Sequence, residues 1–190
     1  RGRYSRGSSE TILDEDLAVL RKDGGPEELV ATLRKQIGRL DFEPGDFAGR
    51  GAGNALFSLV FLALKAKGAT DWRSGLGLSL THQGRYHYIQ YHHIFPKALL
   101  KTKYEKQEIN EIANMAFVSG RMNREIGATE PATYLPNVVA SRGEQALTMQ
   151  GVPLDADLHR LENYRAFLDA RRTTLTRLIT EFLENAKSSK

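Results

Sequence analysis

The apolar segment from Ala55 to Leu64 constrains the fold most, because it leaves a helix no continuous polar face to turn toward solvent. Helices of this kind are normally buried in a protein core or in a bilayer. A membrane-spanning helix needs about 20 apolar residues, and this segment is far shorter. We therefore expect a helix that begins after Asn54, lies at the centre of the hydrophobic core, and belongs to a protein without membrane contact.

Most other apolar residues recur at helical spacing. We expect an acidic helix capped by Thr11, a second helix that begins at Pro26, and a long amphipathic helix from Asp155 onward. Ser119 is suited to cap a helix that runs to about Ile126 and ends at Gly127. The pattern also predicts single turns or short helices over 97–101 and 105–113, a proline-bounded element over 131–136, and a helix over 141–149.

Strand-like segments are few. Aromatic and alternating residues predict strands over 76–81 and 86–91 around a glycine turn, and a further strand over 113–118. The expected fold class is therefore mainly α within the α+β group, a helical domain that holds one small antiparallel motif.

Composition limits the number of domains, the cellular compartment and the classes of partner that this chain can have. The 190 residues are 41% hydrophobic, which suits one domain over 11–190 after a polar linker over 1–10. The absence of cysteine excludes disulfides and a cysteine-ligated zinc site, and it fits a reducing cytoplasm. A net charge of +4 permits a nucleic-acid partner. The N-terminus lacks the pattern of a signal peptide, and because it begins with Arg, we expect a fragment of a longer protein.

Two adjacent histidines followed by two asparagines carry the chemical content of the sequence. His92 and His93 end a predicted strand, Asn114 opens an apolar run, and Asn123 lies on the predicted helix. Phosphodiester hydrolysis needs a base for water, and a neutral imidazole supplies one near pH 7. It also needs charge at the phosphate, which a divalent cation with few protein ligands can supply. These residues therefore predict a one-metal phosphodiesterase site.

Neighbouring side chains on a regular strand point to opposite faces. His92 and His93 can serve one site only if the strand ends or bends there. Pro96, three residues after His93, favours a strand that ends nearby.

The segments 91–97, 110–117 and 121–126 resemble the ββα-metal, or HNH, nuclease motif in its His-Asn-Asn form. They are most similar to the C-terminal nuclease domain of GmrSD/SspE-type phage-defence restriction enzymes of bacteria. The flanks at 2–5, 10–17 and 131–135 are similar too, so the resemblance covers most of the chain. It implies a helical domain that encloses a small ββα-metal HNH hairpin-helix motif, with its core over 85–127.

The resemblance also implies a role for each residue. His93 matches the general base, and Asn114 the middle asparagine that orients the base and braces the loop. His92 and Asn123 match the metal ligands, with Mg²⁺ as the expected ion and Mn²⁺ or Ni²⁺ as alternatives, because imidazole is a softer ligand than magnesium prefers. The wider HNH pattern has Asp where this chain has His92 and His where it has Asn123, which predicts weak metal binding.

The implied function is metal-dependent nicking or cleavage of foreign double-stranded DNA. The implied partner in the same polypeptide is an N-terminal nucleotide-hydrolysing sensor domain that lies outside this sequence. Arg121, Arg124, Lys97 and Lys101 surround the motif and are the candidates for phosphate contacts.

Several alternatives stay open at this stage. Asn110 competes with Asn114 for the middle position, although we expect it on a helix surface because Asn114 leads the apolar run. The basic residues are equally compatible with an ordinary solvated face. A catalytically silent DNA-binding or regulatory module and an RNase-type toxin are the alternative functions.

Overall fold

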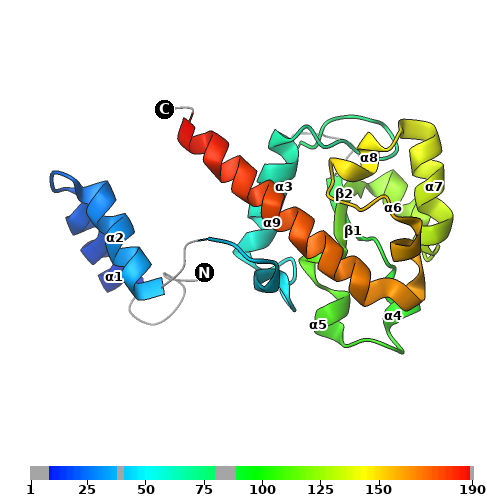
Figure 1. Ribbon diagram of the computed structural model, residues 1–190, viewed down its shortest axis with the longest axis horizontal. Helices are drawn as coiled ribbons and strands as arrows, with labels where there is room; N and C mark the ends of the chain where they lie inside the picture. The colour runs from blue at the N-terminus through cyan, green and yellow to red at the C-terminus, as the bar shows by residue number, and fades with distance from the viewer. Residues whose placement is uncertain (1–8, 38–40, 80–88, 189–190) are drawn as a thin grey trace. The chain divides into compact units, whose positions relative to one another are not determined.

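The computed structural model describes residues 9–37, 41–79 and 89–188. The chain divides into two compact units, Arg1–Asp41 and Phe42–Lys190. The first unit is a pair of helices, α1 (Ser9–Leu20) and α2 (Gly25–Ile37), drawn in blue in Figure 1. Both expected helices at this end of the chain are therefore present, but α1 begins at Ser9, so Thr11 lies inside the helix and does not cap it. The linker expected over 1–10 lies mostly outside the described residues, and the prediction of a single domain over 11–190 stays a prediction.

The second unit is mainly helical with one small antiparallel sheet, which confirms the broad fold class. Its helices and strands are α3 (Ala55–Ala66), β1 (Ile89–His93), α4 (Lys97–Leu100), α5 (Lys106–Ile109), β2 (Met115–Ser119), α6 (Gly120–Ile126), α7 (Pro131–Arg142), α8 (Gln145–Thr148) and α9 (Tyr164–Ser188). The described residues also form the 3-10 turns η1 (Pro44–Phe47), η2 (Ile112–Asn114), η3 (Ala156–His159) and η4 (Leu161–Asn163). Across the described ranges, no helix is both long and apolar enough to cross a bilayer.

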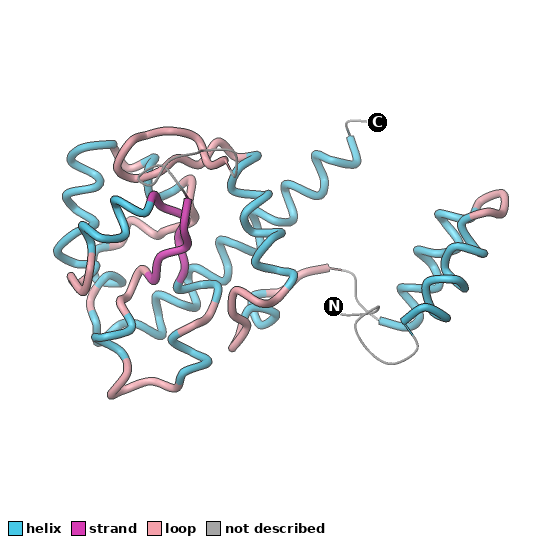
Figure 2. Tube along the Cα trace, turned by 180° about the vertical axis from the view of Figure 1, so that it is seen from behind, coloured by secondary structure: helices cyan, strands magenta, loops and turns pink. Residues whose placement is uncertain are grey.

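Strands β1 and β2 pair antiparallel and lie among the helices of this unit (Figure 2). His92 lies opposite Ala116, and His93 lies opposite Met115. Every residue of β2 is buried, and its two faces enter different hydrophobic clusters. Ala116 belongs to the cluster around Phe95 and Tyr134, whereas Phe117 belongs to the cluster with α3. Because side chains alternate along a strand, β2 separates the two halves of the core.

Helix α3 begins where the sequence predicts, because the Asn54 side chain accepts a hydrogen bond from the Leu56 N–H at 3.0 Å. The expectation that it is buried on all sides is wrong. Leu56, Val60 and Leu64 are buried, but Leu62 is 49% exposed. The exposed side of α3 instead forms one wall of a groove of about 830 Å³, whose other wall includes residues of β1.

Two further expectations need correction. Of the strand expected over 76–81, residues 76–79 are described, and there only Gly77 makes a bridge, to Thr70. The expected glycine turn and the start of the second strand lie outside the described residues, as does the beginning of the motif core at 85. The helix expected over 141–149 is also wrong. Gly143 adopts a φ of 77° and ends α7, so a separate short helix, α8, follows it.

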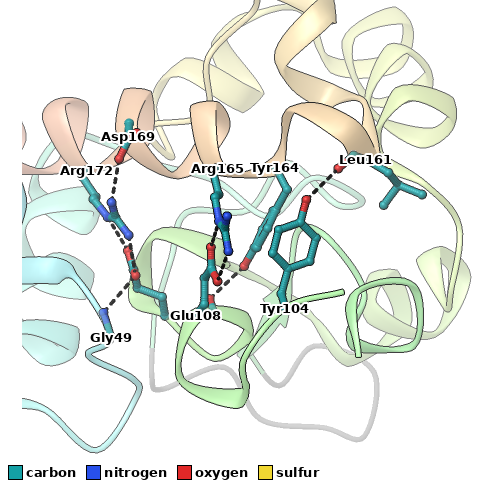
Figure 3. A network of polar contacts seen from close by, with 9 residues as sticks. Gly49, Tyr104, Glu108, Leu161, Tyr164, Arg165, Asp169 and Arg172 are labelled. Atoms are coloured by element: carbon teal, nitrogen blue, oxygen red, sulfur yellow. Dashed lines mark hydrogen bonds and ion pairs between the residues drawn. The ribbon is translucent and has the colours of Figure 1, made fainter. Parts of the chain in front are cut away.

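Ion pairs tie α9 to the segment that carries α5 and η2 (Figure 3). Arg172 meets Glu111 at two points, with Nε–Oε1 and Nη2–Oε2 distances of 2.6 and 2.8 Å, and the Gly49 N–H donates to Oε2 at 3.0 Å. Arg165 meets Glu108 in the same manner, at 2.7 and 3.3 Å. The Glu111 side chain is only 1% exposed, so its carboxylate is an internal anchor for this segment.

Arg171 lies next to this network but is fully buried. Its Nη2 donates to the Met115 carbonyl at 2.7 Å and to the Gln150 carbonyl at 3.0 Å. Gln150 in turn donates to the Phe117 carbonyl and accepts from the Phe117 N–H. Within the described part of the chain, Nε and Nη1 of Arg171 have no hydrogen-bond partner. Burial lowers the pKa of Arg171 to about 9. Helix α9 thus holds β2 directly.

Candidate active site at the end of strand β1

His93 is the last residue of β1, and its side chain faces the groove beside α3. Its ring lies edge-on to that of Tyr91, with ring centroids 6.2 Å apart. Nε2 lies 3.2 Å from Oδ1 of Asn110, the residue that follows α5. Lys97, at the start of α4, lines the same groove. The candidate base is therefore half-buried, contacted by two polar neighbours and open to the groove.

The environment of His93 favours the neutral imidazole. Burial is the main cause that lowers its pKa to about 4, and the positive charge of Lys97 lowers it further. The hydrogen bond to Asn110 acts in the opposite direction, and His92 contributes a smaller lowering. At pH 7 the ring is unprotonated on one nitrogen and can accept a proton from water.

His92 lies on the opposite face of β1, where its side chain meets helix α6. Its Nδ1 lies 2.6 Å from Oδ1 of Asn123, and Nδ2 of Asn123 donates to Oε1 of Gln90 at 2.9 Å. Since the Asn123 amide nitrogen faces Gln90, the Asn123 oxygen must face His92, and in this arrangement the His92 Nδ1–H donates to it. Among the described residues, the buried Nε2 of His92 has no partner. The two candidate metal ligands are thus brought together.

His92 and Asn123 are residue types that suit a light cation site. Burial lowers the pKa of His92 and keeps its imidazole neutral, as a metal ligand must be. In the arrangement described above, the nitrogen beside the Asn123 oxygen is the protonated Nδ1, and the lone pair of His92 lies on the buried Nε2. A cation can therefore bind both side chains only after the hydrogen bond between them is replaced. The described residues contain no cluster of three His, Asp or Glu side chains. The expected site relies instead on two neutral ligands.

Asn114 is fully buried and closes the connection between β1 and β2. Its Oδ1 accepts from the Phe95 N–H at 2.8 Å, and its Nδ2 donates to the carbonyls of Phe95 and Ile109 at 3.1 and 3.0 Å. The Asn114 carbonyl also accepts from the Ile94 N–H. These contacts match the loop-bracing half of its expected role. The side chain that faces His93 is Asn110.

We expect Asn114→Ala to lower the free energy of unfolding by about 2–3 kcal/mol, because three buried backbone groups lose their partner. Urea unfolding followed by circular dichroism measures the change. Asn137→Ala is the matched control, since that exposed amide donates only to the Thr133 carbonyl, and its effect should stay within about 0.5 kcal/mol. Equal losses in the two variants would contradict the bracing role.

Stability should fall on acidification through the two site histidines. Their folded-state pKa values lie below the ordinary value of 6.5, that of His93 at about 4. Between these pH values the unfolded chain binds protons that the folded chain does not. The contribution of His93 is therefore fully present above pH 6.5 and is lost as the pH falls toward 4. As the pH is lowered from 8 to 4.5, the free energy of unfolding should fall more steeply for the native chain than for His93→Gln, whereas parallel curves would exclude the lowered pKa.

The four candidate DNA contacts lie around this site. Lys97 and Lys101 are exposed on and just after α4, and Arg121 and Arg124 are exposed on α6. Arg121 pairs with Glu125 at 3.1 Å, so part of its charge is already matched. The described residues thus place basic side chains on the helices that flank both histidines.

Sequence reasoning gave no role to Gln90, and it preferred Asn114 to Asn110 for the middle position of the motif. Gln90 orients Asn123, and the alternation of β1 was an available signal, because Gln90 and His92 are two apart and share a face. Asn110 was placed on a helix surface, but its side chain contacts His93. No spacing rule would have revealed that contact, because it depends on how residues 94–114 fold.

Comparisons of this chain with protein-family models, with curated proteins and with solved structures find no match. The resemblance to GmrSD/SspE-type nuclease domains therefore remains a prediction from the sequence, and the function has to be inferred from the residues themselves.

Proposed function

We propose that this chain is a metal-dependent HNH-type DNA endonuclease domain that hydrolyses phosphodiester bonds. The observation that carries the proposal is the arrangement at the end of β1. A neutral, half-buried His93 lies on one face, and the paired side chains of His92 and Asn123 lie on the other. Both histidines lie within the paired part of β1, on opposite faces, so the proposal requires a phosphodiester to reach around the end of this strand.

In the proposed reaction, His93 takes a proton from a water molecule while the water oxygen attacks phosphorus. The bond from phosphorus to the 3′ oxygen breaks, and that oxygen leaves with a proton from solvent, which yields a 5′-phosphate and a 3′-hydroxyl. The chemistry supplied by a divalent cation, when His92 and Asn123 bind one, is charge neutralisation at the phosphate and help for the leaving oxygen. Asn114 keeps the segment that follows His93 in place.

Double-stranded DNA is the proposed substrate. Lys97, Lys101, Arg121 and Arg124 are exposed around the site and can meet backbone phosphates, a contact that carries little sequence information. The resemblance to phage-defence enzymes supports a role as the effector part of a larger restriction protein. In that proposal, a nucleotide-hydrolysing sensor domain of the same polypeptide chooses the target.

Relaxation of supercoiled plasmid tests the proposal. The purified chain is incubated with plasmid and Mg²⁺, Mn²⁺ or Ni²⁺, and agarose gels follow nicked and linear products. We expect products with at least one metal and none in excess EDTA. Asn123→Ala should need more metal for the same rate, whereas Asn137→Ala, on an exposed face of α7, should behave as the native chain does.

The same assay separates the alternatives. A gel shift of DNA without cleavage in any metal would favour the silent binding module. Cleavage of single-stranded RNA with intact plasmid in a parallel reaction would favour the RNase-type toxin. Either outcome would overturn the proposed activity.

A further inference from the structure

The side chain of Asn110 has only one orientation that satisfies its contacts. Its Nδ2 lies 2.7 Å from the carbonyl of Lys106, four residues earlier. A carbonyl only accepts hydrogen bonds, so the amide nitrogen must face Lys106 and the amide oxygen must point the other way. That oxygen lies 3.2 Å from Nε2 of His93. The contact with the candidate base is therefore an acceptor contact.

An acceptor at this position selects one form of the neutral imidazole. With its proton on Nε2, His93 donates to Asn110, whereas with its proton on Nδ1 it would place a lone pair against the amide oxygen. A hydrogen bond of ordinary net strength changes such a population about fivefold. The Asn110 contact thus leaves the lone pair of His93 on Nδ1.

The backbone around Asn110 is fixed by contacts from other parts of the unit. The Ile112 N–H donates to the Arg50 carbonyl at 2.8 Å. Gly51 lies so close that an added Cβ would be 2.9 Å from the Asn110 carbonyl oxygen. Glu111, the next residue, is held by Arg172. These contacts on both sides of Asn110 fix its backbone. A residue can position another group only if it is itself fixed in this way.

We propose that Asn110 is a positioning residue that sets the tautomer of His93 and makes Nδ1 its proton-accepting atom. The catalytic half of this inference rests on the proposed function, whereas the tautomer itself does not. Asn114, fully occupied by Phe95 and Ile109, braces the loop, and Asn110 orients the base. Asn114 and Asn110 thus divide two roles, bracing the loop and orienting the base, that the sequence motif assigns to one asparagine.

Nitrogen-15 NMR of the metal-free chain at pH 8 tests the tautomer without any need for cleavage. His93→Gln assigns the signals of the His93 ring. We expect a protonated Nε2 and an unprotonated Nδ1 in the native chain, with the share of the Nδ1–H form rising about fivefold in Asn110→Ala. Asn110→Asp keeps an acceptor and should keep the native tautomer. A native Nδ1–H form, or an Asn110→Ala spectrum like the native one, would overturn the proposal.

Plasmid nicking then tests the consequence for catalysis. Asn110→Ala should lower kcat by up to about fivefold with KM for plasmid nearly unchanged, because only the fraction of rings with a free Nδ1 is active. Asn110→Asp should recover most of the rate. Asn137→Ala, which has the same amide contact to a carbonyl four residues earlier but no histidine beside it, should have no effect.

The NMR measurement and the nicking assay distinguish failure of the positioning role from failure of the proposed function. The expected tautomer without any nicking by the native chain would contradict the proposed function and leave the positioning role intact. Loss of nicking in both Asn110→Ala and Asn110→Asp, with an unchanged ring tautomer, would show that Asn110 only supports the structure.

Discussion

His93→Ala should lower the rate of plasmid nicking by about 10²–10⁴-fold, the usual contribution of a positioned general base. Among the described residues that line the groove, removal of the imidazole leaves no other histidine and no carboxylate that could act as the base. The ring lies at the surface of the groove and outside the main core, so the variant should fold. Initial rates of nicked-circle formation at saturating plasmid and metal measure the effect.

The control for this prediction is His159→Ala. His159 is buried and its Nε2 contacts the Pro153 carbonyl at 2.8 Å, away from the two strands. Its loss should reduce stability but leave the rate of the folded protein close to native. Asn123→Ala should differ from both, with a higher metal requirement and partial recovery at high metal. Nicking by His93→Ala at the native rate would exclude His93 as the base.

Arg172→Ala should lower the free energy of unfolding by about 3–5 kcal/mol, because it leaves the carboxylate of Glu111 buried without its cation. Only the Gly49 N–H would then remain among the partners described above for that carboxylate. The two-point contact at 2.6 and 2.8 Å makes this the strongest ion pair between α9 and the α5–η2 segment. Chemical denaturation of the native chain and the variant measures the loss.

Two further variants serve as controls for this prediction. Arg177→Ala breaks an exposed pair with Glu181 one turn away on α9, and should change stability by about 0.5 kcal/mol or less. Replacement of both Glu111 and Arg172 by Met removes the charges together and should recover much of the lost stability. A small effect of Arg172→Ala, similar to that of Arg177→Ala, would rule out Glu111 as a buried anchor.

The features that sequence analysis predicted correctly depend on local chemistry. The Ser119 hydroxyl accepts from the Met122 N–H and begins α6, and Gly127, with a φ of 54°, ends it. Asn54 caps α3 in the same way. Each of these contacts joins residues a few positions apart, so the residue types and their spacing were sufficient to predict them.

The features that were missed depend on contacts between distant parts of the chain. Nothing near Leu62 indicates that the side of α3 facing the groove stays uncovered. Arg171 is a different case, because its spacing from Phe167, Leu175 and Leu178 places it on the buried stripe of α9. Its charge alone favours exposure to solvent, because arginine is rarely buried without partners. A buried arginine needs carbonyl partners, and those come from β2 and from Gln150, far away in the sequence.

Because α9 is hydrogen-bonded to β2, the candidate site can fold completely only late in synthesis of the chain. A nascent chain synthesised only as far as Asn123 already contains every candidate catalytic residue. It still lacks Arg171, which holds the Met115 carbonyl, and Arg172, which holds Glu111. The ribosome must therefore release most of α9 before the strands and the loop between them can reach their final positions. Any hydrolytic activity of this chain should accordingly appear late in translation, after the segment that carries the chemistry has long left the exit tunnel.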